Sequence, residues 1–136
     1  MRKLIIANWK SNPDSSRQAI ALAKAIDRKG VVIAPPYPFL ETVGKTIKKA
    51  ELGAQDVFWA DSGPYTGEVS LKQLKSLGVK YVILGHSERR RHLGETDELI
   101  NRKVKAALKA GFKVILCVGE PKRENLALAK TYVRNQ

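Results

Sequence analysis

Three polar side chains that could take part in proton transfer follow one apolar stretch of the chain. Residues 81–84 (Tyr-Val-Ile-Leu) have the composition of a buried strand, and Gly85 ends that strand. His86, Ser87 and Glu88 come directly after it. In a protein built from βα units the carboxyl ends of the strands carry the chemistry, because the loops there converge on one face. A histidine at this place could exchange a proton near neutral pH, although capping the following turn is the simpler alternative for it.

The composition is that of a chain able to form a core around such a site. The 136 residues are 43% hydrophobic and 28% charged, which is typical of one globular domain over residues 1–136. Cys117 is the single cysteine, so an internal disulfide is excluded, and a dedicated zinc site is not expected. The first apolar run is too short for a signal sequence, and no stretch is long enough to cross a membrane. These features predict a soluble cytoplasmic protein.

The formal net charge of +12 raises the possibility of a nucleic-acid partner. The lysines, however, are spread along predicted helix surfaces, and only Arg89-Arg90-Arg91 form a compact cluster, which adjoins Glu88. No aromatic residues are interleaved with these cations to stack on bases. The pattern favours a solvated basic surface, and we expect neither a nucleic acid nor a membrane as a partner.

Five apolar runs predict strands, and a helical pattern follows each of them. The runs are continuous rather than alternating, which is typical of parallel strands buried on both faces. The strands are predicted at residues 4–7, 31–34, about 51–55, 81–84 and 114–118. Asn12 with Pro13 predicts the start of the first helix. Ser70 with Gln73 forms a capping-box pattern, and Thr96 is a further N-cap candidate.

A long segment without a helix or strand pattern, Asp56 to Val69, separates the third predicted strand from the capping box. Loops of more than about 12 residues inside compact domains usually have a function or contact a partner. We therefore expect this loop to be functional or to form an interface.

Two architectures fit repeated βα units: an open doubly wound sheet and a closed eight-stranded barrel. A doubly wound dinucleotide-binding fold would place a glycine-rich phosphate turn after the first strand, where this chain has Asn8-Trp9-Lys10. A barrel needs eight units in about 250 residues, so five units would form an incomplete one.

Five groups of short strings, in order along the chain, resemble the triosephosphate isomerases. They are Ala7-Asn8-Trp9-Lys10; Ala34-Pro35-Pro36; Gly53-Ala54-Gln55 with Tyr65-Thr66-Gly67-Glu68; Gly85 to Arg90 followed by Gly94-Glu95-Thr96-Asp97; and Cys117 to Glu120. The resemblance implies an α/β protein of the TIM (β/α)8 barrel family, present here as an incomplete barrel of about five βα units. It also implies interconversion of dihydroxyacetone phosphate and D-glyceraldehyde 3-phosphate in glycolysis and gluconeogenesis, without a metal or organic cofactor.

The resemblance also implies roles for four residues at the strand ends. His86 would be a neutral imidazole that polarises the substrate carbonyl and shuttles protons along the enediolate. Lys10 would place a positive charge beside the substrate phosphate, and Asn8 would donate a hydrogen bond to the substrate. Glu88 would pair with Lys10 and hold it in place.

A second set of residues is implied to join two subunits of a homodimer. In the family the long loop enters the neighbouring subunit, which here concerns Thr66, Gly67 and Glu68. Glu68 would face an arginine like Arg89 of that neighbour. The Asp56–Val69 loop is therefore the expected dimer contact.

One catalytic part of the family pattern has no counterpart in this chain. The family's general base is a glutamate in a Tyr-Glu-Pro-Val-Trp-like segment, which is absent here, as are the phosphate-binding turns after strands seven and eight. The last helical pattern also reaches Gln136 without a stop signal. We therefore expect a chain that stops before the general base and is inactive by itself. Two alternatives stay open: an inactive half-barrel that only self-assembles, and a basic nucleic-acid-binding α/β module.

Overall fold

The continuous apolar runs form the strands of one parallel sheet in the computed structural model, which describes residues 3–120 and 126–136. The strands pair in the order in which they occur in the chain. They are β1 (Ile5–Asn8), β2 (Val31–Ala34), β3 (Glu51–Ala54), β4 (Tyr81–Leu84) and β5 (Lys113–Leu116). The fifth strand begins one residue earlier than predicted and ends at Leu116 rather than Val118.

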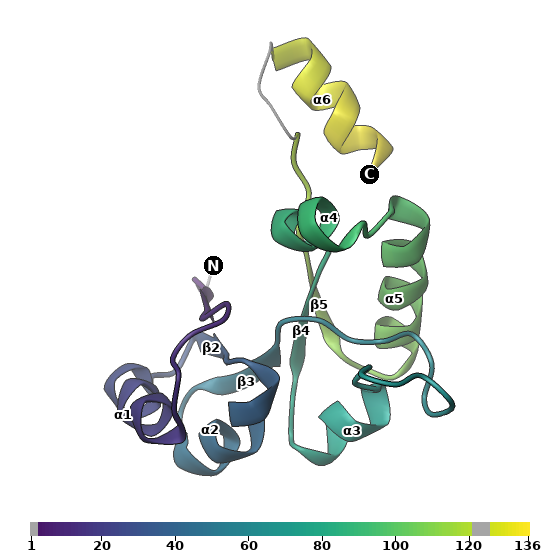
Figure 1. Cartoon of the computed structure of the whole chain (residues 1–136). Helices are drawn as coiled ribbons and strands as arrows, with labels where there is room; N and C mark the ends of the chain where they lie inside the picture. Colours follow the sequence, from purple (N-terminus) through teal and green to yellow (C-terminus); the bar gives the residue numbers. More distant parts are fainter. Residues whose placement is uncertain (1–2, 121–125) are drawn as a thin grey trace.

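Figure 1 shows the sheet curling, with α1, α2, α3 and α5 outside it and α4 beyond the end of β4. The helices are α1 (Ser16–Ile26), α2 (Leu40–Thr46) after a 3-10 turn (Tyr37–Phe39), α3 (Leu71–Ser76), α4 (Ser87–Leu93), α5 (Asp97–Lys109) and α6 (Leu126–Asn135). Strand order that follows chain order has no switch point, which a doubly wound sheet requires. The fold is therefore an incomplete βα barrel of five units, as predicted.

The main core lies between the sheet and the outer helices. Ala19 and Ala23 of α1, Val43 of α2 and Leu74 of α3 are fully buried there. Every residue of β4 is also buried, so the strand that leads to His86 is fixed along its whole length. A site at the end of β4 thus has a rigid base.

The first helix begins later than the sequence predicted. Its N-cap is Ser15, whose side chain accepts from the Gln18 N–H, and not Asn12. The Asn12 N–H instead donates to the Trp9 carbonyl and closes the turn that follows β1. Asparagine favours caps and turns alike, so its type could not distinguish the two.

The other two predicted helix starts are confirmed. Ser70 and Gln73 form a reciprocal capping box at α3, and the Thr96 side chain accepts from the Leu99 N–H at α5. Both signals are local in the sequence, which is why they could be found without the fold. Within the described residues, no helix has the length and apolar character needed to span a membrane.

Asp27 joins the end of α1 to the segment that enters β3. Its carboxylate accepts from the N–H groups of Lys48, Lys49 and Ala50 at 2.7–2.8 Å. These hydrogen bonds, the one from Ala50 first, lower the pKa of Asp27 below its ordinary 3.8.

The lowered pKa of Asp27 predicts a pH-dependent contribution to stability. A carboxyl whose folded pKa lies below its unfolded pKa stabilises the fold fully above the unfolded value and loses that effect as the pH falls through the folded one. Asp27→Asn should therefore lower the melting temperature at pH 7, and the deficit should shrink below the ordinary pKa of 3.8. Thermal melts at several pH values measure it, with the exposed Asp14→Asn as control. An equal deficit at every pH would contradict the charge-based account.

Candidate functional site

The turn after β1 presents Lys10 in an unusual backbone conformation. Lys10 has φ of 56°, the left-handed region that non-glycine residues seldom occupy. Two hydrogen bonds hold it there: its N–H donates to Asn8 Oδ1 at 3.0 Å, and Gln55 Nε2 donates to its carbonyl at 2.8 Å. Because Asn8 Oδ1 is occupied in this way, the Asn8 NH2 group is the part of that side chain left to donate to a ligand. Strained backbone held by its surroundings is common at functional sites.

Gln55 is a site residue whose role the sequence did not reveal. The residue follows β3, and its Nε2 also donates to the Ala34 carbonyl at 2.9 Å. Gln55 therefore ties the ends of β2 and β3 to the Lys10 turn. The sequence pointed to Gln55 only as part of the Gly53-Ala54-Gln55 string. Its contact with Lys10 could not be predicted, because that contact depends on the fold.

The turn after β4 presents His86, and it needs a glycine to do so. Gly85 has φ of 73°, and a Cβ there would lie 3.0 Å from the Cys117 carbonyl oxygen. His86 then caps α4: its Nδ1 accepts from the Glu88 N–H at 3.2 Å. His86 can therefore cap the helix and still take part in proton transfer. Since Nδ1 accepts, the neutral ring carries its proton on Nε2, which can act as a donor.

The β1 and β4 turns meet through one ion pair. Lys10 Nζ donates to Glu88 Oε1 at 2.5 Å, which is the contact that the resemblance implied. This bond from Lys10 lowers the pKa of Glu88, so Glu88 is ionised at neutral pH. A hollow of about 200 Å³ lies at this junction, lined by residues that include Asn8, Lys10, Gln55, His86 and Glu88.

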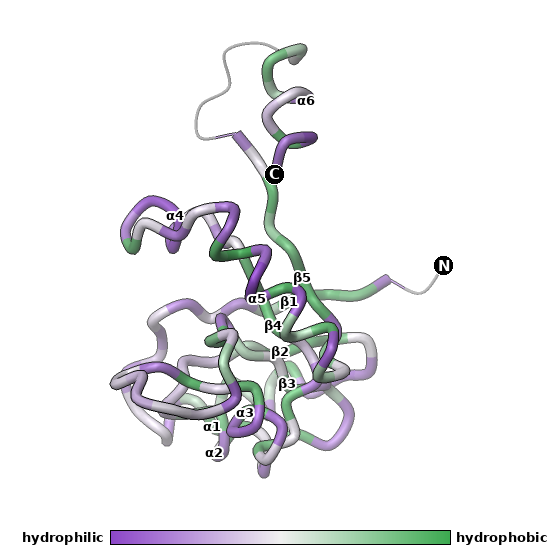
Figure 2. Tube along the Cα trace, turned by 90° about the vertical axis from the view of Figure 1, so that its right-hand side faces the viewer, coloured by the Kyte–Doolittle hydropathy of each residue, from purple (hydrophilic) through white to green (hydrophobic). Residues whose placement is uncertain are grey.

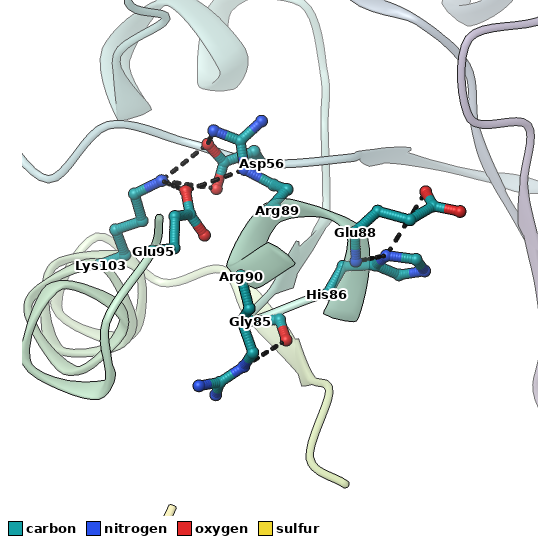
Figure 3. Close-up of polar contacts among 8 residues, drawn as sticks. All are labelled: Asp56, Gly85, His86, Glu88, Arg89, Arg90, Glu95 and Lys103. Carbon is teal, nitrogen blue, oxygen red and sulfur yellow. Dashed lines mark hydrogen bonds and ion pairs between the residues drawn. The ribbon is translucent and has the colours of Figure 1, made fainter. Parts of the chain in front are cut away.

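Two arginines of α4, Arg89 and Arg90, tie that helix to its surroundings (Figure 3). Arg90 Nε donates to the Gly85 carbonyl at 2.9 Å and its guanidinium pairs with Asp97. Arg89 pairs with Asp56 at 2.9 Å and with Glu95 at 2.8 Å. Arg89 is therefore occupied within its own chain, while also lining the hollow.

Asp56 and Glu95 share a second cation, the buried Lys103, and form a four-residue cluster with Arg89. Burial raises the pKa of Asp56 despite the two cations. Burial acts the same way on Glu95, but hydrogen bonds from Lys103 and Arg89 outweigh it and lower the pKa of Glu95. The sequence did not reveal this cluster, because its members come from three segments that only the fold brings together.

The long loop lies away from the hollow. Thr66, Gly67 and Glu68 are all exposed and none of them lines the hollow. Aromatic contacts brace the loop: the Phe58 ring lies 3.9 Å from that of Trp59 and 4.5 Å from that of Tyr65, between centroids. The loop is thus an exposed segment with a packed base, available to another molecule.

The hollow brings together an imidazole N–H donor, an ammonium and an amide. These groups suit a small anionic substrate with a carbonyl oxygen, because donors and a positive charge stabilise an oxyanion that develops on it. Among the described residues that line the hollow, Glu88 is the one carboxylate, and it is engaged by Lys10. Within the described part of the chain, the hollow therefore contains polarising groups and no unpaired carboxylate.

Comparisons with known proteins agree with these features. A family model described as "Triosephosphate isomerase" matches residues 3–136. The chain is 49% identical over 129 residues to the triosephosphate isomerase of Thermoanaerobacter pseudethanolicus, covering 88% of this chain and 52% of the relative. It is 46% identical over 132 residues to that of Chlorobium phaeovibrioides, covering 90% and 53%, and 41% identical over 148 residues to that of Thermodesulfovibrio yellowstonii, covering 98% and 60%. The chain thus spans about half the length of the curated relatives it matches.

Proposed function

The chain belongs to the triosephosphate isomerase family, and from this premise we propose that its site takes part in interconverting dihydroxyacetone phosphate and D-glyceraldehyde 3-phosphate. The observation that supports this most is the His86 ring, whose Nδ1 accepts from the Glu88 N–H. That bond leaves the proton of the neutral ring on Nε2, and His86 lines the hollow together with Asn8 and Lys10. We also infer a cytoplasmic location, which suits a chain with a single cysteine.

In the proposed reaction a base removes a proton from the substrate carbon next to the carbonyl, and an enediolate forms. His86 Nε2–H donates to the carbonyl oxygen as negative charge develops there, an interaction stronger in the transition state than in the bound substrate. Lys10 supplies a fixed positive charge for the phosphate and the enediolate, and the Asn8 NH2 group donates to the substrate. Glu88 keeps Lys10 at this position through their 2.5 Å contact. In this proposal the base comes from outside these 136 residues.

A joined chain tests the proposal. We define it as residues 1–136 followed by the carboxyl-terminal part of the Thermoanaerobacter pseudethanolicus relative, from the point where the two sequences cease to match. The joined chain should isomerise dihydroxyacetone phosphate in a coupled assay. A folded joined chain without activity would overturn the proposed function.

We further propose that the Asp56–Val69 loop joins two subunits of a homodimer through its exposed residues Thr66, Gly67 and Glu68. Deleting residues 65–68 from the joined chain should convert a dimer into a monomer and reduce turnover at the same time. Sedimentation and the coupled assay measure the two effects. In a control variant residues 66–68 are changed to Ser-Gly-Ser, so that the loop keeps its length. This variant separates loss of the side chains from shortening of the loop. A deletion variant that stays dimeric would contradict this assignment.

A further inference from the structure

Helix α4 carries the proposed catalytic groups but buries no apolar side chain against the core. His86 caps it and Glu88 lies in its first turn, yet none of its seven residues is buried. Leu93, its one aliphatic residue, is 63% exposed. Figure 2 accordingly shows most of this helix as hydrophilic. A short helix gains most of its stability from packing an apolar face, so α4 must be positioned in another way.

Polar contacts are what hold α4 in place. Two of them involve exposed carboxylates: Glu88, which pairs with Lys10, and Asp97, which pairs with Arg90. Exposed pairs of this kind contribute little, because water screens them and side-chain ordering opposes them. The contact of Arg89 with the buried cluster is different, since its two carboxylate partners are 5% and 3% exposed.

Lys103 decides the charge of that cluster. Its side chain is 3% exposed, and its Nζ lies 2.7 Å and 2.9 Å from the two Asp56 oxygens and also contacts Glu95 Oε1. With Lys103 present, two cations balance two carboxylates. Without it, Arg89 alone would face two buried carboxylates, and an uncompensated buried charge disrupts its surroundings. Glu95 Oε2 already lacks a hydrogen-bond partner among the described residues, so the cluster has no spare donor.

We propose that Lys103 is a positioning residue for the site: it balances Asp56 and Glu95 so that they hold Arg89, and Arg89 fixes α4 with His86 and Glu88. Lys103 lies on α5 and is not among the residues that line the hollow, so it acts through the others. Its importance for catalysis rests on the proposed function. The positioning itself can be measured without any assay of activity.

The experiment uses two samples of the 136-residue chain: one labelled with ¹⁵N-histidine, which gives signals from only two imidazoles, and one labelled uniformly with ¹⁵N, which gives the Glu88 amide. In the unchanged chain the neutral His86 ring should show an unprotonated Nδ1 and a protonated Nε2. In Lys103→Met the Glu88 N–H bond to Nδ1 should be lost, so the two tautomers should mix and the Glu88 amide should exchange at least tenfold faster. Lys105→Met, on the exposed face of the same helix, is the matched control and should change neither signal.

A second variant separates charge balance from packing of the lysine stem. Lys103→Met combined with Asp56→Asn leaves one carboxylate for one guanidinium, and the side-chain oxygen of the new asparagine can still accept from Arg89. The double variant should restore the His86 tautomer and the protection of the Glu88 amide. Unchanged His86 signals in a folded Lys103→Met chain would overturn the proposal. A double variant that does not restore these signals would also overturn it. If Lys103→Met alone does not fold, the double variant should fold, and its failure to do so would overturn the proposal as well.

Discussion

His86→Gln in the joined chain should lower turnover by roughly two to four orders of magnitude, the usual share of a positioned acid–base group. Glutamine could still present an N–H to the substrate carbonyl, but it cannot pass a proton between the two oxygens of an enediolate. The loss should therefore fall on turnover far more than on the Michaelis constant. Steady-state kinetics with both triose phosphates measure the two parameters.

The fold should tolerate this substitution, so that the loss can be assigned to chemistry. The His86 side chain is only partly buried, and the glutamine oxygen can take over the capping bond from the Glu88 N–H. His92→Gln is the matched control, because His92 is exposed on the same helix and does not line the hollow. Turnover of His86→Gln within threefold of the unchanged joined chain would remove His86 from the mechanism.

The features of this fold that could be predicted from sequence are those set by local patterns. The apolar runs predicted the strands to within about two residues at their ends, and the capping box at Ser70 and Gln73 was correct in detail. Such signals act between residues a few positions apart, so they need no knowledge of the fold. The wrong cap at Asn12 shows their limit, since the same residue types form caps and turns.

The supports of the candidate site were not predictable, because they are contacts between distant segments. The Lys10 conformation depends on Gln55, and the cluster joins residues 56, 89, 95 and 103. In the sequence Lys103 resembles any other lysine of a basic helix. Its burial at 2% follows only from the fold, in which α5 packs against β4 and β5 and the lysine reaches Asp56. The resemblance identified residues that would touch a substrate, whereas the structure identified the ones that hold those residues.

The second large effect concerns the 136-residue chain by itself, which should show no isomerase activity above background. Polarising a carbonyl is only part of the proposed reaction, since a base must also remove a proton from the adjacent carbon. The carboxylate nearest to His86 is Glu88, which Lys10 holds in an ion pair and whose lowered pKa makes it a weaker base. We therefore expect turnover at least about four orders of magnitude below that of the joined chain, the upper end of the range for one acid–base group.

The curved sheet gives an independent reason for the same expectation. Within the described residues β1 and β5 each pair on one side only, and Ile5 and Leu116 at these edges are 62% and 44% exposed. A closed barrel would cover both edges and enclose the hollow, and excluding water strengthens the interactions of Lys10 and His86 with substrate.

Both chains should be produced in an isomerase-deficient host, with their His86→Gln forms as blanks for contaminating enzyme. If the 136-residue chain reached within a hundredfold of the joined chain, a carboxylate inside it would have to be the base. Glu120, which follows β5 and lines a hollow together with His86, would be the first to replace by glutamine.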